Sequence, residues 1–203
     1  MIPDKLTLYY PRKPFLINQV FGANPDYYSR FKDRYGFPEK GHPGLDLRAP
    51  HGEPIYAACD GLAHHAHDSH GGEGVVIRTG RFAYKDGMAS FDVVHWHLIG
   101  DTDSKYPSPI KIDGTSTLVK TGTLIGYADN TGAPFESSGD HLHLGLTPYN
   151  DSGDAIESTN GFNGCIDPTL YFTGYYAEDY DTLITKFRSL ILILQKWVGL
   201  LPH

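Results

Sequence analysis

The sequence predicts a mainly β fold, an antiparallel sheet or sandwich, with one amphipathic α-helix at the C-terminal end. Short apolar runs separated by turn-forming residues recur about every 8 to 12 residues, which is typical of such sheets. The 203 residues include 23 Gly, 14 Pro and 14 Tyr, a composition that favours turn-rich β structure over helices. Only near residue 180 does the apolar pattern change to a helical period.

The first 41 residues are expected to form a strand-like lead and then a long loop. Residues 1–22 carry well-spaced apolar side chains and end at a Gly. Residues 23–41 are polar and aromatic without a clear period, which predicts an ordered loop or a short helix. Loops of this length in compact domains are often functional, and this one runs directly into His42. We therefore expect it at the rim of a site.

Short strands make up the next part of the chain. Asp60-Gly61 predicts a hairpin between two of them, Gly71-Gly72 predicts a turn, and residues 79–90 read as a polar hairpin. Residues 128–140 and 147–178 are expected to be irregular. The expected strands cover residues 41–48, 54–59, 62–67, 74–78, 91–98, 118–126 (a pair around a turn) and 141–146.

The C-terminal segment predicts a helix of about 20 residues. Its apolar residues alternate in steps of four and three: Tyr180, Ile184, Phe187, Ile191, Leu194, Val198 and Leu201. The chain is accordingly divided into a domain at 1–178, with its core at about 15–172, and a helix at 179–201. The apolar stripe is expected to pack on its own domain. Self-association through this helix is the main alternative, and binding to a membrane surface is a minor one.

Charge and composition exclude several classes of function. The formal net charge is −7 and the charges are scattered, so binding to nucleic acid or to an anionic membrane is not expected. No apolar run approaches the ~18 to 20 residues that span a bilayer, so no transmembrane segment is expected. Cys59 and Cys165 are too few for a disulfide scaffold. They are expected to be free thiols, with a single bridge as the alternative.

Histidines at alternate positions mark two of the expected strands. His141 and His143 share one face, and the three leucines at 142, 144 and 146 share the other, which faces a core. The same alternation places His95 and His97 together, opposite the apolar residues 94, 96 and 98. Imidazoles presented from separate parts of the chain predict a metal site.

A carboxylate completes the expected ligand set. Catalytic zinc takes three protein ligands of N or O type and leaves one position to water. His42, Asp46 and one histidine of the 141–143 pair would supply two imidazoles and a carboxylate. Zinc lowers the pKa of its water to roughly 7 and polarises a carbonyl group. The helix-borne motif His-Glu-x-x-His is absent, so acid–base chemistry falls to the remaining histidines.

The order of the motifs is more specific than any one motif. After the His42-to-Asp46 motif come GEPIYAACDG (52–61), GEGVVI (72–77), HWHL (95–98), KTGTLIG (120–126) and HLHL (141–144). In this order and spacing, residues 15–172 closely resemble the lysostaphin/LytM-type zinc endopeptidases, which cut peptidoglycan peptides. The resemblance implies a small antiparallel β fold with one Zn²⁺ per chain at the floor of a groove. It implies His42, Asp46 and His143 as the ligands.

The resemblance also implies that His97 and His141 are catalytic without binding the metal. His95 stands where the family usually has an aromatic residue, and it is expected to line the groove or to orient His97. Gly139-Asp140 replaces the usual Gly-Pro, which alters the approach to the groove and removes no ligand. Family members often use a tyrosine upstream of the first ligand. Tyr35 is the nearest candidate, although the loop at 23–41 does not fix the alignment.

The function implied by the resemblance is hydrolysis of peptide bonds in peptidoglycan stems or cross-bridges, at the cell envelope in an extracellular or periplasmic location. No signal peptide is visible, so the expected source is a phage lysin or an enzyme whose leader has been removed. One rival is a catalytically inactive peptidoglycan-binding or hydrolase-activating module, which typically loses a ligand. The other is a zinc D-Ala carboxypeptidase, whose relatives space the first His and Asp more widely.

Four further histidines, His64, His65, His67 and His70, form a local cluster. Alternation places His65 and His67 on one face, where Asp68, out of register, is the only acidic neighbour expected. Because the ligand set is incomplete, a solvated hairpin is expected here rather than a second metal site.

Overall fold

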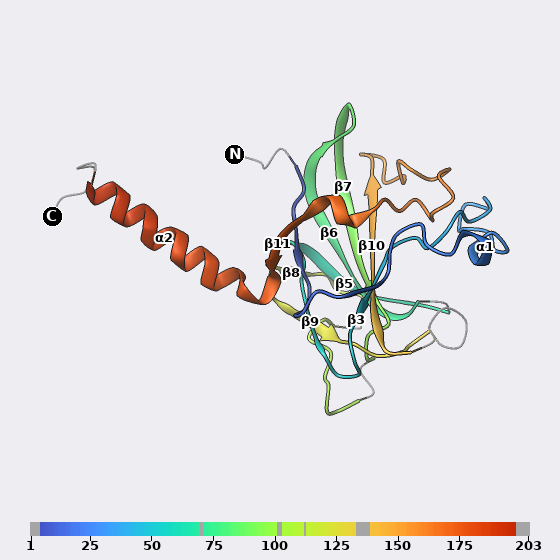
Figure 1. Ribbon diagram of the computed structural model, residues 1–203, viewed down its shortest axis with the longest axis horizontal. Coiled ribbons are helices and arrows are strands. Elements are labelled where there is room, and N and C mark those ends of the chain that lie inside the picture. Colours follow the sequence, from blue (N-terminus) through green and yellow to red (C-terminus); the bar gives the residue numbers. More distant parts are fainter. Residues whose placement is uncertain (1–4, 70, 101–102, 112, 133–138, 198–203) are drawn as a thin grey trace.

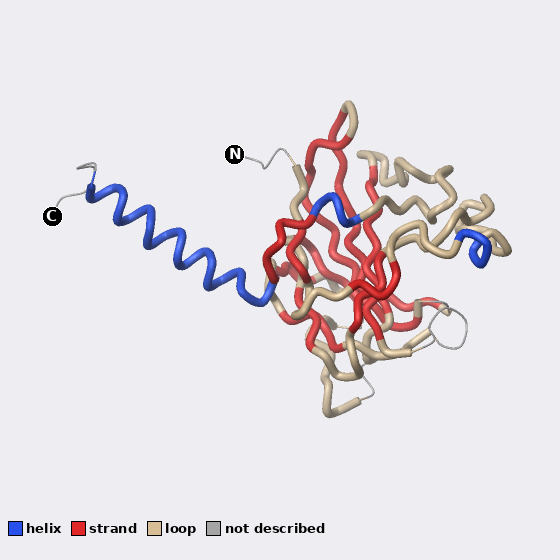
Figure 2. Tube along the Cα trace, viewed as in Figure 1, coloured by secondary structure: helices blue, strands red, loops and turns tan. Residues whose placement is uncertain are grey.

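The computed structural model describes residues 5–69, 71–100, 103–111, 113–132 and 139–197 (Figures 1 and 2). Its main element is a seven-stranded sheet in the order β2-β3-β10-β7-β6-β5-β8. All neighbouring strands in this sheet are antiparallel, which confirms the predicted fold class. The strands are β2 (Ile17–Gln19), β3 (Leu45–Arg48), β5 (Gly61–Asp68), β6 (Gly72–Tyr84), β7 (Gly87–Trp96), β8 (Thr117–Val119) and β10 (His141–Tyr149).

Two small strand pairs flank this sheet. β1 (Leu8–Tyr10) pairs in parallel with β11 (Phe172–Tyr176), and β4 (Pro54–Tyr56) pairs antiparallel with β9 (Leu124–Tyr127). Because parallel strands need a long connection, the β1–β11 pair ties the beginning of the domain to its end. The short helices are α1 (Pro25–Tyr28), η1 (Pro168–Tyr171) and η2 (Ala177–Asp179).

The core lies on one face of β10, as the alternation predicts. Leu142, Leu144 and Leu146 are fully buried. Burying one leucine side chain contributes about 1.5–3 kcal/mol, and a one-residue slip would turn all three toward solvent. The three leucines therefore fix which face of β10 carries the histidines. Cys59 and Cys165 are both buried free thiols.

The predicted hairpin at Asp60-Gly61 is wrong. β4 pairs with β9, whereas β5 pairs with β6 and β8, so the two strands on either side of this dipeptide are not partners. Instead, the Asp60 carboxylate accepts hydrogen bonds from the Thr121 backbone N–H (2.9 Å) and the Lys120 ammonium (2.7 Å). The dipeptide Asp-Gly looks the same in the sequence whether the Asp side chain closes its own turn or, as here, accepts hydrogen bonds from a distant turn.

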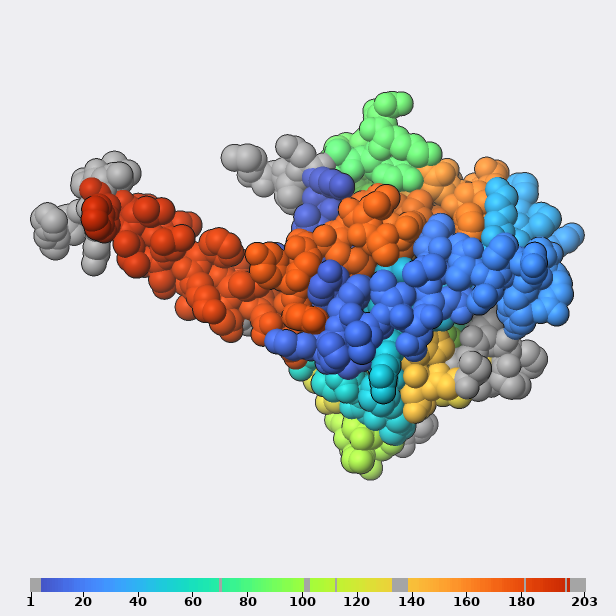
Figure 3. All heavy atoms as spheres, in the orientation of Figure 1, coloured from blue at the N-terminus to red at the C-terminus, as the bar shows by residue number. Residues whose placement is uncertain are grey.

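The predicted C-terminal helix is present as α2 (Tyr180–Trp197). It leaves the domain after η2 and extends away from it, as Figures 1 and 3 show. The expectation that its apolar stripe packs on its own domain is therefore wrong: Phe187, Leu194 and Trp197 are each more than half exposed. Val198 and Leu201 lie outside the described residues. In the described part of the chain, no helix has the length and apolar character needed to cross a membrane.

Candidate metal centre

Strand pairing brings the predicted ligands together. In the β3–β10 ladder, Asp46 and His143 are direct partners, so their side chains lie side by side on one face. His42 lies four residues before Asp46, on the turn that enters β3. Its backbone is fixed by two hydrogen bonds, from His42 N–H to the Ala23 carbonyl and from Gly22 N–H to the His42 carbonyl, both 2.9 Å.

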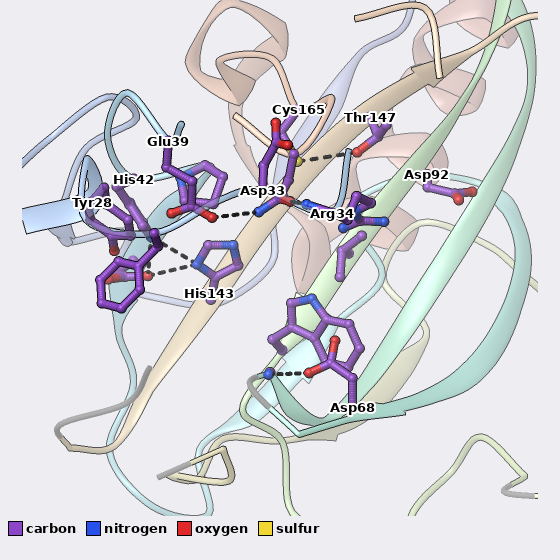
Figure 4. A pocket seen from close by; sticks show the side chains of 18 of the residues that line it. Tyr28, Asp33, Arg34, Glu39, His42, Asp68, Asp92, His143, Thr147 and Cys165 are labelled. Carbon is purple, nitrogen blue, oxygen red and sulfur yellow. Dashed lines mark hydrogen bonds and ion pairs between the residues drawn. The ribbon is translucent and has the colours of Figure 1, made fainter. Parts of the chain in front are cut away.

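The three predicted ligand atoms form a nearly equilateral triangle. His42 Nε2 and His143 Nδ1 lie 3.0 Å apart, and each lies 3.1 Å from Asp46 Oδ1. Zinc binds nitrogen and carboxylate ligands at about 2.0–2.1 Å, which separates two tetrahedral ligand atoms by about 3.3 Å. The spacing, and a donor set of two imidazoles and one carboxylate, therefore fit a zinc ion. Figure 4 shows His42 and His143 directed toward each other at one end of a cavity.

Neighbouring backbone groups fix the two imidazoles that are predicted to be ligands. His42 Nδ1 lies 3.3 Å from the Val20 carbonyl, and donation to it leaves Nε2 for a metal. A Cβ atom added at Gly44 would lie 2.7 Å from His143 Nε2 and 2.6 Å from the Leu144 carbonyl oxygen. Only glycine allows this close approach, which explains the Gly between His42 and Asp46 in the motif.

The two predicted catalytic histidines lie beside this triangle. The rings of His97 and His141 have centroids 4.5 Å apart, and His141 Nε2 lies 3.5 Å from Asp46 Oδ1. His97 Nδ1 lies 2.7 Å from the Thr131 carbonyl oxygen, and His141 Nδ1 lies 2.7 Å from that of Gly139. Donation from both Nδ1 atoms leaves the lone pair of each neutral ring on Nε2.

Burial and the clustered imidazoles set the charge states of this site. Burial alone would raise the pKa of Asp46, but hydrogen bonding from His141, His143 and His42 holds that pKa well below its usual range. Burial, together with the nearby His143 and His141, lowers the pKa of His97 to about 4, so its ring is neutral at pH 7. Burial opposes protonation of His141, whereas the hydrogen bond and the negative charge of Asp46 promote it. The net effect is a raised pKa of His141.

The site lies in a cavity of about 710 Å³. Strands β7 and β10 line it with Val94, Trp96, Gly145 and other residues, and the loop at 27–43 lines the other side. This confirms the predicted position of the loop at the rim. The loop is held by Asp33, whose carboxylate accepts the backbone N–H groups of residues 35 and 37 at 3.0 and 2.9 Å. Figure 4 shows Arg34 and Thr147 among the side chains that line the cavity.

The predicted orientation of His95 is wrong. His95 is fully buried and its Nδ1 lies 3.3 Å from the Val75 carbonyl oxygen, whereas Val94 and Trp96 line the cavity. The alternation holds along β7, but the strand ends at Trp96 and His97 adopts φ = 64°. This left-handed conformation turns His97 back into the cavity, away from the face that His95 occupies.

A tyrosine not assigned a role from the sequence lies beside His42. Tyr28 lines the cavity, and its ring centroid is 5.8 Å from that of His42. Its hydroxyl accepts a hydrogen bond from Gln19 Nε2 at 3.1 Å. Tyr35 packs near Gly164 instead and is not among the residues that line the cavity. The only sequence signal for Tyr28 was its place in an aromatic loop that precedes His42.

The histidine cluster has an acidic partner that sequence analysis missed. Glu73, on the neighbouring strand β6, lies opposite His67 in the ladder. Its carboxylate oxygens lie 2.9 Å from His67 Nδ1 and 2.6 Å from His65 Nε2. The expectation that only Asp68 supplies a nearby carboxylate is therefore wrong, because pairing across strands was not considered. His70 lies outside the described residues.

Comparison of sequences adds nothing to this description: no protein-family model and no curated protein matches the chain. Solved structures do match. A zinc-containing peptidase from Vibrio cholerae is 23% identical with a TM-score of 0.51; the match covers 81% of this chain and 39% of that one. A Pseudomonas aeruginosa protein assigned to the M23 peptidases is 20% identical with a TM-score of 0.52, and the match covers 84% and 52% of the two chains.

A third match is the catalytic domain of the antimicrobial peptidase lysostaphin from Staphylococcus simulans. It is 21% identical with a TM-score of 0.50, and the match covers 77% of this chain and 91% of that domain. The chain thus spans most of the lysostaphin catalytic domain but about half or less of the two larger proteins. The expected lysostaphin-type fold is confirmed. Activity, substrate and site residues do not follow from the fold itself.

Proposed function

We propose that this chain is a zinc-dependent metalloendopeptidase that hydrolyses peptide bonds in peptidoglycan stems or cross-bridges. The convergence of His42 Nε2, Asp46 Oδ1 and His143 Nδ1 within 3.0–3.1 Å of one another at a cavity wall carries this proposal. The fold shared with a zinc-containing peptidase and with the lysostaphin catalytic domain supports it. An inactive module has no need of a complete ligand set with two further histidines beside it.

The three ligand atoms would hold one Zn²⁺ ion. When bound, zinc supplies a Lewis acid that polarises a carbonyl group and activates water at neutral pH. Asp46 contributes the only negative charge of the ligand set, and its lowered pKa keeps that charge available. The buried position of His42 and its bond to the Val20 carbonyl keep its ring in one orientation.

His97 and His141 would carry the proton transfers of peptide hydrolysis. Each ring donates from Nδ1 to a backbone carbonyl, so Nε2 is the atom that exchanges a proton with the substrate. A neutral His97 can accept a proton at Nε2 from the attacking water. His141 carries a proton on Nε2 when its ring is protonated, a state that the nearby Asp46 carboxylate promotes, and in that state it can donate to the developing oxyanion or to the departing amine.

The cavity fits an extended peptide. Its floor runs along β10, where His143, Gly145, Thr147 and Tyr149 lie on one face at alternate positions. Three residue pairs along a strand span about 20 Å, or roughly six residues of an extended substrate. We place the reaction at the cell envelope, outside the cytoplasm, because that is where peptidoglycan lies.

Purified peptidoglycan of defined cross-link chemistry provides the test. The zinc-loaded chain should release soluble fragments, and mass spectrometry should show cleavage at internal bonds. Removal of zinc with 1,10-phenanthroline should abolish the release, and added Zn²⁺ should restore it. Release of terminal D-Ala alone would favour the carboxypeptidase alternative. Binding to the wall without any cleavage by the zinc-loaded chain would contradict the proposal.

A further inference from the structure

The helix α2 carries a continuous apolar surface that is exposed in the described part of the chain. Phe187, Leu190, Ile191, Leu194 and Trp197 are each more than half exposed, on a helix that extends away from the domain (Figure 3). Its first turn packs on the domain, where the rings of Tyr9 and Tyr180 meet edge to face at 5.2 Å. Contiguous exposed apolar surface of this kind marks an interaction site.

The spacing of this surface is that of a coiled coil. The residues at the core positions a and d of a heptad alternate in steps of four and three: Tyr180 (d), Ile184 (a), Phe187 (d), Ile191 (a) and Leu194 (d). Both a positions hold the β-branched Ile, and Leu194 supplies leucine at one d position, a combination that favours two parallel strands. Tyr180 and Phe187 occupy the other two d positions and add aromatic contact area. We propose that α2 pairs with the α2 of a second copy of this chain, in parallel and through this a/d surface.

The available area is sufficient for such a pair. Leu183, Leu190 and Trp197 occupy the adjoining g positions and widen the a/d surface. A fully enclosed aromatic side chain buries about 150–250 Å². With the aliphatic residues included, pairing would remove on the order of 1,200 Å² over both copies, which is the lower limit of stable specific interfaces. A helix of 18 residues offers few a and d positions, and burial of the g residues in the interface adds the contact area that these positions lack.

Charge favours a second copy over a membrane surface. In a parallel pair, the e position of one helix faces the g position of the other. Arg188 at e therefore faces apolar g residues of the second helix and meets no like charge there. The net charge of −7 opposes a second copy as well as an anionic lipid surface, so the preference comes from α2 itself. Its basic residues, Lys186 and Arg188 among them, are few for a membrane-surface helix. The basic residues Lys186 and Arg188 lie outside the a/d surface.

Pairing of two α2 helices would join two catalytic domains in one dimer. This consequence, unlike the pairing itself, rests on the proposed function. Peptidoglycan is a polymer with repeating peptides, so binding of one domain would raise the effective concentration of the second at the wall. Pairing should therefore increase activity on intact walls more than activity on a short soluble peptide.

Sedimentation equilibrium of the full zinc-loaded chain tests the pairing. We expect a concentration-dependent mass that reaches twice 22.5 kDa below about 100 µM. The double substitution Ile191→Lys and Leu194→Lys should raise the dissociation constant at least about 100-fold. Thr185→Lys with Ser189→Lys adds the same two charges on the polar face and should change it less than about threefold. Zinc content and thermal midpoint should be unchanged in both.

Three results would overturn this inference. One is a monomer at all concentrations up to about 100 µM. Another is equal weakening by the two double substitutions. The third is sedimentation of a monomeric chain with vesicles of phosphatidylserine and phosphatidylcholine, which would identify α2 as a membrane-surface helix. Loss of cleavage alongside retained dimer formation would count against the proposed function and leave the pairing intact.

Discussion

Two of the three His-x-His segments, at 95–97 and 141–143, belong to neighbouring, hydrogen-bonded strands and behave differently. On β10, His143 lines the cavity and His141 lies on the same face, with its Nε2 3.5 Å from Asp46 Oδ1, whereas the leucines between and after them fill the core. On β7 only His97 reaches the cavity, whereas His95 is enclosed beneath the sheet. The difference arises at the strand end, because β10 continues past His143 and β7 stops at Trp96. Alternation describes side-chain direction only while the backbone stays extended.

The largest effect is expected within the β10 pair. His143→Ala removes a ligand and should abolish zinc retention and reduce hydrolysis by at least about 10³-fold. His141→Ala should keep the zinc and lower kcat by about 10²–10⁴-fold, because it removes a proton-transfer group only. Metal analysis after dialysis, together with fragment release from peptidoglycan, separates the two. A His141→Ala chain that loses zinc but keeps full activity would refute both assignments.

A parallel contrast is expected within the β7 pair. His97→Ala should lower kcat by about 10²-fold or more with zinc retained, since its Nε2 faces the reaction. His95→Leu should leave kcat and KM within about twofold, because its ring is enclosed on the other side of the sheet. Steady-state kinetics on a soluble cross-link peptide measures both. If His95→Leu lowered kcat as much as His97→Ala, His95 would take part in catalysis, which would contradict its position on the other side of the sheet.

A smaller loss is expected when the packing around His143 is disturbed. Gly44→Ala forces a methyl group against His143 Nε2 and the Leu144 carbonyl, at 2.7 and 2.6 Å. Zinc affinity should fall about 10–100-fold, and the free energy of unfolding by about 1–3 kcal/mol. The matched control is Gly80→Ala, where an added Cβ has no neighbour within 4 Å. Zinc competition with a chelating dye and urea unfolding provide the measurements; equal effects at both glycines would contradict the prediction.

The smallest effect concerns pH. Burial lowers the pKa of His95 to about 4 from 6.5, and its Nε2 has no hydrogen-bond partner among the described residues. Between these two values only the unfolded chain binds the proton, so the free energy of unfolding falls as the pH drops through 6.5 toward 4. From pH 7 to pH 5 the loss should be about 2 kcal/mol.

The His95→Leu chain isolates this contribution from those of other groups. Urea unfolding of both chains at pH 7 and pH 5 should show the natural chain losing about 2 kcal/mol more than the variant. An equal loss in both chains would mean that His95 is protonated in the folded state or that its surroundings open to water.

From the residues alone, strand alternation, which is a local signal, predicted a site formed by His42, Asp46 and one histidine of the 141–143 pair, and the family resemblance singled out His143. Asp46 is held opposite His143 by two short strands, and leucines on the reverse face of β10 leave the histidines one direction to point. His97 could not be oriented in the same way. Its left-handed conformation depends on the backbone bonds from His97 N–H to Gly71 and from Asp129 N–H to His97, which join distant segments.

Other features also depend on distant partners. The role of Asp60 is set by residues 120–121, and that of Glu73 by a strand pairing. The position of Tyr28 near His42 depends on how the rim loop folds back onto β2. The stripe on α2 was visible in the sequence, but an apolar period is the same whether a helix covers its own domain or another chain. Its exposure could be learned only from the fold.

The carbonyl groups that hold His97 and His141 belong to Thr131 and Gly139, at the two ends of one connection between β9 and β10. Every amino acid supplies such an oxygen, so the orientation of each ring depends on the course of the backbone rather than on a side-chain partner. At Thr131 that course is fixed by the side chain, whose hydroxyl accepts a hydrogen bond from the Glu73 N–H at 3.0 Å and donates one to the Leu98 carbonyl at 2.9 Å. The orientation of His97 therefore depends on strand β6 through Thr131.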